Sequence, residues 1–202
     1  MTAAIRGFFT SLASIPKPIQ SFLLRGLLIL VIWKIVYLGF LAFPRTLDRP
    51  LTNLVGNHSA WLLNQAFHSN TYTATEKLHV TNFEGELQIA PVSRIDKNGK
   101  KLLHIADGCN GLELFVLYVG FILAMPAPVK RKLLFIPVGL IIIHLVNILR
   151  CAGLCVMIES WKEQFDFAHH YVFKMMIYGV IFALWVKFSQ AVHFKKESTH
   201  DL

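Results

Sequence analysis

Three polar residues at the ends of apolar segments, Cys109, Arg150 and His169, are of the types that covalent catalysis requires. A thiolate is a nucleophile, and a histidine can carry protons to and from leaving groups. An arginine rarely gives up a proton, so its suitable role is to bind a developing oxyanion or a carboxylate. Cys109 lies in the string DGCNG, residues 107–111, just before an apolar segment. Free N–H groups and the dipole at a helix start stabilise a thiolate, so this string indicates thiol chemistry.

Each of these residue types also has a structural interpretation. A cysteine in a membrane core is often a small apolar residue, which is the interpretation favoured for Cys151 and Cys155. A juxtamembrane arginine often anchors at the lipid headgroups. His169 and its neighbour His170 could be interfacial residues, and His144, in the middle of an apolar segment, is expected to form a hydrogen bond between helices.

The spacing of the polar residues predicts that Asn147 supports Arg150, and it does not predict a metal site. Asn147 precedes Arg150 by three positions, which places both on one face of a helix, where the amide can orient the guanidinium. Cys109, His104 and the two adjacent histidines do not form a compact CxxC or HExxH pattern. No metal and no cofactor are therefore expected.

The composition indicates that a membrane positions these residues. Hydrophobic residues make up 54% of the 202, and charged residues 16%, against about 25% in soluble domains. A helix needs about 20 apolar residues to cross a bilayer. The sequence therefore predicts an all-α integral membrane protein with about four transmembrane helices, near residues 22–43, 110–127, 133–157 and 171–188.

The positions of the basic residues predict the orientation of the chain. The formal net charge is +8, but the lysines and arginines gather at the ends of the apolar segments, so nucleic acid is not an expected partner. The basic run 130–132 indicates a cytoplasmic connection. Alternating crossings then place both termini inside and residues 44–109 and 158–170 outside.

The predicted external segment, residues 44–108, contains its own elements. Residues 51–67 have the pattern of an amphipathic helix lying along the membrane surface. Strands are predicted at 71–75, 78–95 and 101–106, with Asn98-Gly99 in a tight hairpin turn. The chain is thereby divided into a cytoplasmic or interfacial segment, a first transmembrane helix, the external segment, a three-helix membrane core and a cytoplasmic tail, at residues 1–20, 21–43, 44–108, 109–190 and 191–202.

Three motifs over about residues 100–190 resemble the exosortase/archaeosortase family of membrane cysteine transpeptidases, in a compact form like that of Bacteroidetes-type bacteria. They are DGCNGL at 107–112, NILR at 147–150, and His169 before the last apolar segment. The resemblance implies that Cys109 is the nucleophile, Arg150 an electrostatic partner and His169 the general acid/base. His170 is the alternative to His169, and Asn147 and Asn110 are supporting residues.

The same resemblance implies a substrate and a location. The substrate would be a secreted protein that ends in a short recognition motif, a transmembrane helix and a basic tail. Cleavage of this sorting signal would leave a thioester on Cys109, which an amine or another acceptor would resolve. The enzyme would be a multi-pass protein of the bacterial inner (cytoplasmic) membrane, embedded in the lipid bilayer, with its site facing the periplasm or exterior.

One residue departs from the family pattern, and two other functions remain open. Glu113 follows the cysteine motif where many family members have a basic residue. A non-catalytic assembly or scaffold protein of the cell envelope would use residues 71–106 to bind a partner. A membrane thiol–disulfide redox protein would need a resolving cysteine, for which Cys151, next to Arg150, is the candidate.

Overall fold

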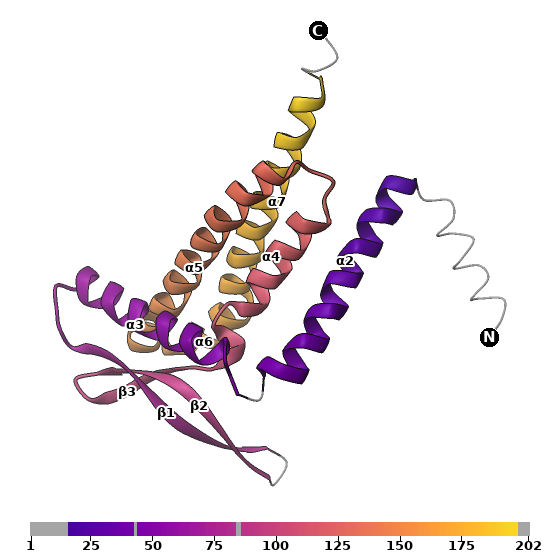
Figure 1. Ribbon diagram of the computed structural model, residues 1–202. Helices are drawn as coiled ribbons and strands as arrows, with labels where there is room; N and C mark the ends of the chain where they lie inside the picture. The colour runs from indigo at the N-terminus through magenta and orange to yellow at the C-terminus, as the bar shows by residue number, and fades with distance from the viewer. Residues whose placement is uncertain (1–15, 43, 84–85, 198–202) are drawn as a thin grey trace.

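The computed structural model describes residues 16–42, 44–83 and 86–197 of the chain. Long helices stand side by side, and an amphipathic helix and a three-stranded sheet lie across one end of them (Figure 1). We call this end the sheet end. The start of the first described helix, the connection between α4 and α5 and the end of α7 all lie at the opposite end (Figure 1).

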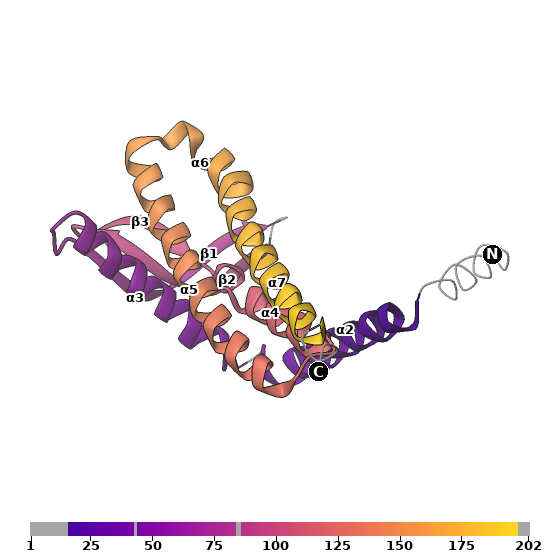
Figure 2. The ribbon, with the colours of Figure 1, turned by 90° about the horizontal axis from the view of Figure 1, so that it is seen from above.

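Three helical stretches are long and apolar enough to cross a membrane: Lys17–Leu41, Val129–Ser160 and Lys162–Gln190. The first consists of α2 (Lys17–Val36) and a π-helical turn, η1 (Tyr37–Leu41). The second is α5 (Val129–Ser160). The third begins with the short elements η3 (Lys162–Gln164), α6 (Phe165–Phe167) and η4 (Ala168–Val172), which connect α5 to α7 (Phe173–Glu197) at the sheet end (Figure 2).

The predicted crossing at residues 110–127 is shorter than expected. It forms α4 (Leu112–Ala124), a helix of 13 residues. At about 1.5 Å per residue such a helix covers about 20 Å of a hydrocarbon core about 30 Å thick. The helix starts only after Gly111, whose φ is 90°, and stops at Met125, whose extended backbone precedes Pro126. The described residues thus contain three helices of spanning length and one shorter apolar helix, so a count of four full spans is not established.

The predicted amphipathic helix is α3 (Asp48–Ala66). Its buried face includes Val55, Ala60 and Leu63, which pack in one core with Cys151 and Cys155 of α5. His144 of α5 and His58 of α3 add a ring-to-ring hydrogen bond of 3.0 Å, which confirms the helix-to-helix contact expected for His144. The fold therefore fixes α3 across the sheet end of α5. Of the predicted cytoplasmic or interfacial segment at residues 1–20, residues 1–15 lie outside the described part of the chain.

The sheet contains β1 (Tyr72–Phe83), β2 (Glu86–Lys97) and β3 (Lys100–Ile105), antiparallel and in this order. Asn98 and Gly99 both have positive φ, 52° and 74°, as a type I′ turn requires, which confirms the predicted hairpin. The predicted break between the first two strands, near residues 76–77, is wrong. β1 continues through Glu76, because Arg45 and Arg49 neutralise this carboxylate beside the strand.

A second core joins α4 to α5 and α7 and holds the short helix in place. Tyr118 and Ile122 of α4 pack there with Ile143, Ile181 and Phe188. The Tyr118 ring lies directly on Gly139 of α5, where a Cβ atom would overlap it, and its hydroxyl donates to the Phe135 carbonyl at 2.7 Å. The glycine therefore permits the close contact between α4 and α5 that the site requires.

Candidate active site

Cys109 lies at the sheet end, in the connection between β3 and α4. It ends a 3₁₀ turn, η2 (Asp107–Cys109), and its side chain is half-buried. Asn110 follows, and its Oδ1 accepts the Leu112 N–H at 2.8 Å, which satisfies a free donor at the start of α4. Asn110 and Gly111 thus separate Cys109 from the first residue of α4, and the helix starts two residues later than the predicted position 110.

Two residues of α5 hold Cys109 from one side. Arg150 Nη2 lies 3.5 Å from Cys109 Sγ, and Asn147 Nδ2 donates to the Cys109 carbonyl at 3.0 Å. Asn147 Oδ1 also accepts from Arg150 Nη1 at 3.4 Å, so one amide positions both the cysteine backbone and the guanidinium. A cationic donor facing a sulfur is the type of neighbour that stabilises a thiolate.

The backbone around Cys109 depends on a glycine. Gly111 has a φ of 90°, a conformation that strains residues with a side chain. A Cβ atom at this position would also lie 3.3 Å from Asn147 Nδ2. Gly111 thus allows α4 to begin beside Asn147 while Asn147 bonds Cys109.

The Arg150 guanidinium retains an unused donor. Only 9% of the residue is exposed, and among the described residues its Nε has no hydrogen-bond partner. A buried donor without a partner costs about 1–3 kcal/mol. Nη2 of the same guanidinium, at 3.5 Å from the sulfur, places the positive charge next to the thiol, an arrangement that suits the binding of a carbonyl oxygen or an oxyanion there.

Arg45 and α3 hold the cysteine turn from the other side. Arg45 Nε and Nη2 donate to the two oxygens of Asp107 at 2.7 and 2.6 Å, and Thr52 Oγ1 donates to Asp107 Oδ1 at 2.7 Å. Burial disfavours the charged form of Asp107, but the hydrogen bonds from Arg45 and Thr52 outweigh it and lower the pKa of the carboxyl. This pair of charges therefore locks the first residue of the turn.

A buried carboxylate, Asp48, completes this second set of contacts. It is 3% exposed, and its two oxygens accept from Asn110 Nδ2 at 2.9 Å and from the Tyr37 hydroxyl at 2.8 Å. Thr52 Oγ1 also lies 3.3 Å from Asn110 Nδ2. The sequence reasoning assigned no role to Arg45, Asp48 or Thr52. The sequence did contain one signal of their buried position. Asp48 and Thr52 are four residues apart and therefore lie on the same helix face as the apolar Val55.

The two histidines differ in their surroundings. His169, in η4, is half-buried, stacks on Phe165 with 5.7 Å between ring centroids, and lies within electrostatic reach of Arg150. His170 is exposed, and its Nδ1 lies 3.0 Å from the Asp166 carbonyl oxygen. Within the described part of the chain, no hydrogen bond joins either histidine to Cys109. The structure thus assembles Cys109, Arg150, Asn147 and Asn110, with His169 within electrostatic reach of Arg150.

The other cysteines and the acidic residues do not extend the site. Cys109, Cys151 and Cys155 are free thiols, and Cys151 is only 2% exposed. The residues that the structure describes contain no group of three or more His, Cys, Asp or Glu side chains that could hold a metal ion.

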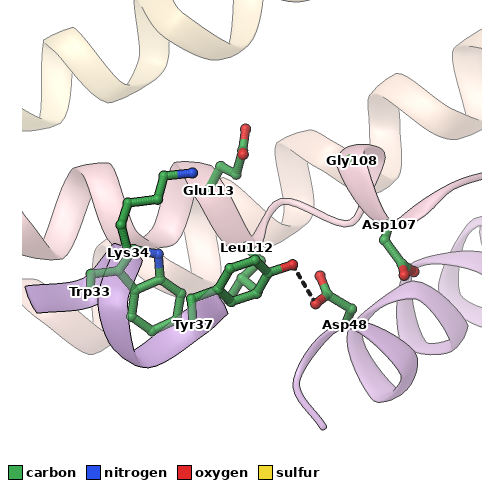
Figure 3. Close-up of a pocket in the computed structure, with 8 residues that line it drawn as sticks. All are labelled: Trp33, Lys34, Tyr37, Asp48, Asp107, Gly108, Leu112 and Glu113. Atoms are coloured by element: carbon green, nitrogen blue, oxygen red, sulfur yellow. Dashed lines mark hydrogen bonds between the residues drawn. The ribbon is translucent and has the colours of Figure 1, made fainter. Parts of the chain in front are cut away.

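A small hollow lies beside the cysteine turn, where α2, α3 and α4 meet (Figure 3). In Figure 3 the Tyr37 hydroxyl points to Asp48, and the Lys34 side chain extends toward Glu113. Gly108, the neighbour of Cys109, also lines this hollow. The turn that carries the cysteine is therefore reachable from the α2 side.

The fold and the site define a multi-helix membrane protein with a cysteine and an arginine in contact at the end of its helices. A family model for the transmembrane exosortase (Exosortase_EpsH) matches residues 8–186. The chain belongs to this family. No curated protein and no solved structure matches the chain.

The ion pair between Arg45 and Asp107 predicts a dependence of stability on pH. Asp107→Asn should lower the Tm of the purified protein in detergent by about 2–4 °C near pH 7, the shift that about 1 kcal/mol produces in a chain of this size. Because the pKa of Asp107 is lowered from its ordinary 3.8, its stabilisation is present above that value and is lost as the pH falls through the lowered pKa.

The difference in Tm between the two proteins should therefore shrink below about pH 4. Glu159→Gln, which removes the ion pair with Lys97 on the sheet, serves as a control for a carboxylate remote from the turn. A difference that stays constant from pH 7 to pH 3 would contradict the assignment.

Proposed function

We propose that the protein is a membrane-embedded cysteine protease/transpeptidase that cleaves the C-terminal sorting signal of secreted proteins and transfers them to an acceptor. The contact between Arg150 Nη2 and Cys109 Sγ carries this proposal, together with the unpartnered Nε of the same guanidinium. These atoms offer a nucleophile and a cationic donor at one place, as acyl transfer requires. Membership of the exosortase family supports the same reaction class.

In the proposed reaction the Cys109 thiol gives its proton to His169, and the sulfur attacks the carbonyl carbon of the scissile peptide bond. Arg150 binds the oxyanion that forms, because its charge and its Nη2 donor lie beside the sulfur. When the carbon–nitrogen bond breaks, the leaving amine takes a proton from His169 and a thioester remains on Cys109. An acceptor amine then attacks the thioester and gives its proton to His169, and the thiolate leaves. With water as the acceptor, the same steps give hydrolysis.

Two asparagines support these steps without taking part in bond changes. Asn147 fixes the Cys109 carbonyl and the guanidinium in one arrangement. Asn110 accepts a hydrogen bond from the Leu112 N–H at the start of α4 and donates one to Asp48, which joins the turn to α3. Both amides therefore reduce the freedom of the nucleophile before substrate binds.

The arrangement of the helices and the positions of the basic residues support a proposal for the location. We assign the chain to the bacterial inner membrane, with the sheet end and the site on the periplasmic or exterior side and the basic run 130–132 in the cytoplasm. α4 then forms a fourth crossing, in which residues 109–111 and 125–128, which are not α-helical, cover the depth that the helix does not reach. The domain boundaries at 44–108 and 109–190 separate the external segment from the membrane core.

Cysteine labelling tests the proposed orientation. In a variant without the native cysteines, Leu78→Cys on β1, which is 70% exposed, should react with an impermeant maleimide added outside the cell. Lys130→Cys, at the opposite end of the helices, should react only after the membrane is made permeable. Protection of residue 78 in intact cells would contradict a site on the outer face.

The nucleophile is tested by Cys109→Ala and Cys109→Ser. Both variants should insert into the membrane, yet a cognate substrate should accumulate with its C-terminal helix attached, with processing reduced by at least about 10³-fold. Immunoblots of the substrate measure this. Cys155→Ala, at a buried cysteine of the α3–α5 core, is the matched control and should retain processing. Normal processing by Cys109→Ala would remove the nucleophile assignment.

Arg150→Lys separates catalysis from simple anchoring. Lysine keeps the charge but loses the planar set of donors that can bind two oxygens. Processing should fall by on the order of 10²-fold while the protein remains as abundant as the wild type. Arg49→Lys, at an arginine whose side chain is 63% exposed, is the control and should change processing little. Full activity of Arg150→Lys would indicate an anchoring role.

The two histidines are distinguished by single alanine variants. His169→Ala should reduce processing by about 10²–10⁴-fold, the range for loss of a general acid/base, because His169 is half-buried near Arg150. His170→Ala should have a small effect, because this side chain is exposed. The same immunoblot assay compares them, and the reverse order of damage would transfer the acid/base role to His170.

A further inference from the structure

Three hollows follow one another along α4, between α2 and α7. The hollow beside the cysteine turn shares Trp33, Lys34 and Glu113 with a second one, of about 270 Å³, that also reaches Tyr178 of α7. The second shares Leu30 and Leu117 with a third, which extends to Trp185 of α7. Because neighbouring hollows share residues, they form one groove, with α4 as its floor and α2 and α7 as its walls. We call it the α4 groove.

The α4 groove changes from apolar to charged along its length. Its third hollow has only apolar and glycine residues in its lining, among them Leu30, Leu117 and Trp185. At the sheet end the lining contains Lys34 and Glu113, and it ends at Gly108, next to Cys109. A substrate in which a membrane-spanning segment is joined to a polar segment has the same order of polarity as the groove. Its polar segment would lie at the depth of Cys109.

The walls of the α4 groove present apolar side chains that no part of the described chain covers. Leu30 is 39% exposed and Tyr178 is 53% exposed, and α2 has no buried residue. A volume of about 270 Å³ admits side chains but not a whole helix, which is about 10 Å across. The fitting occupant is therefore a helix that lies along the groove and inserts side chains between its walls.

A second large hollow, between α3 and α5, lacks these properties. Its lining includes Trp61 and Leu145 but no carboxylate, lysine or arginine. The packed core of α3 and α5, which contains Val55 and Cys151, adjoins Cys109 on that side. Hence this hollow offers no charged end beside the turn, and its residues provide control positions.

We propose that the α4 groove binds the membrane-spanning segment of the sorting substrate and leads the polar segment that precedes it past Lys34 and Glu113 to Cys109. This inference rests on the proposed function. It adds the surface that recognises the substrate's apolar helix, and it assigns Glu113 and Lys34 to the polar residues between that helix and the scissile bond.

Photo-crosslinking in the membrane tests the groove. The probe is an exported reporter protein whose C-terminal segment is taken from a substrate that the wild type processes and Cys109→Ala does not. A benzophenone amino acid is placed at Leu30 or Tyr178 of the Cys109→Ala protein, and at Leu145, which is 53% exposed in the other hollow, as the control. Adducts with the substrate's C-terminal helix are expected from residues 30 and 178 and not from residue 145.

Several outcomes would overturn the inference. Adducts only with lipid or with a second copy of the chain at residues 30 and 178, or equal substrate adducts at residue 145, would show that another surface binds the helix. The proposed function would stand in these cases, because processing by the wild type is measured in the same cells. If no substrate shows Cys109-dependent processing, the proposed function fails and this inference fails with it.

A variant that narrows the groove gives an independent readout. Leu117→Trp adds bulk at the groove floor, and the kcat/KM of processing should fall about tenfold, mainly through KM, since the reacting groups are unchanged. Leu145→Trp is the matched control and should leave kcat/KM near the wild-type value. An unchanged kcat/KM of Leu117→Trp at normal abundance would contradict the proposal. If Leu117→Trp does not accumulate, the crosslinking result decides.

Discussion

A guanidinium buried where apolar helices meet is the constraint on which the rest of the structure depends. Arg150 is 9% exposed, and a charge in such a place is costly unless it is paired or functional. In this fold it contacts a thiol and an amide and retains one unused donor. Asn147 links the guanidinium to the backbone of Cys109, so the helix that carries the charge also fixes the cysteine. Acyl transfer is the function that we propose for this buried charge.

The cysteine turn is held between two independent supports. α5 supplies Asn147 and Arg150, whereas α3 supplies Asp48 and Thr52, which bind the turn through Asn110 and Asp107. Arg45 adds a bidentate ion pair to Asp107 from the chain just before α3. Arg45 and α3, which precede the sheet in the chain, therefore contribute to the position of Cys109.

The two sides of the turn are suited to different tasks. On the α5 side lie the sulfur and the arginine, with His169 in electrostatic reach of the arginine, and to these groups we assign the bond changes. On the α2 side lies the α4 groove, whose apolar length and charged end suit the recognition of a membrane-spanning segment.

The sequence by itself determined the apolar helices, the amphipathic helix and the hairpin at Asn98-Gly99, whereas the pairing of Cys109 with Arg150 was implied by the resemblance to the exosortase/archaeosortase family. Hydropathy and periodicity report the first three features because each depends on residues close together in the chain. Only the tertiary structure decided that β1 continues through Glu76, since its charge is neutralised by arginines about 30 positions earlier in the chain. The same holds for the support of the turn, where Asp48 and Asn110 are separated by 62 positions. A hydrogen bond or a groove between distant segments leaves no periodic pattern in a single sequence, so Asp48, Thr52, Arg45 and the α4 groove became visible only when the chain was folded.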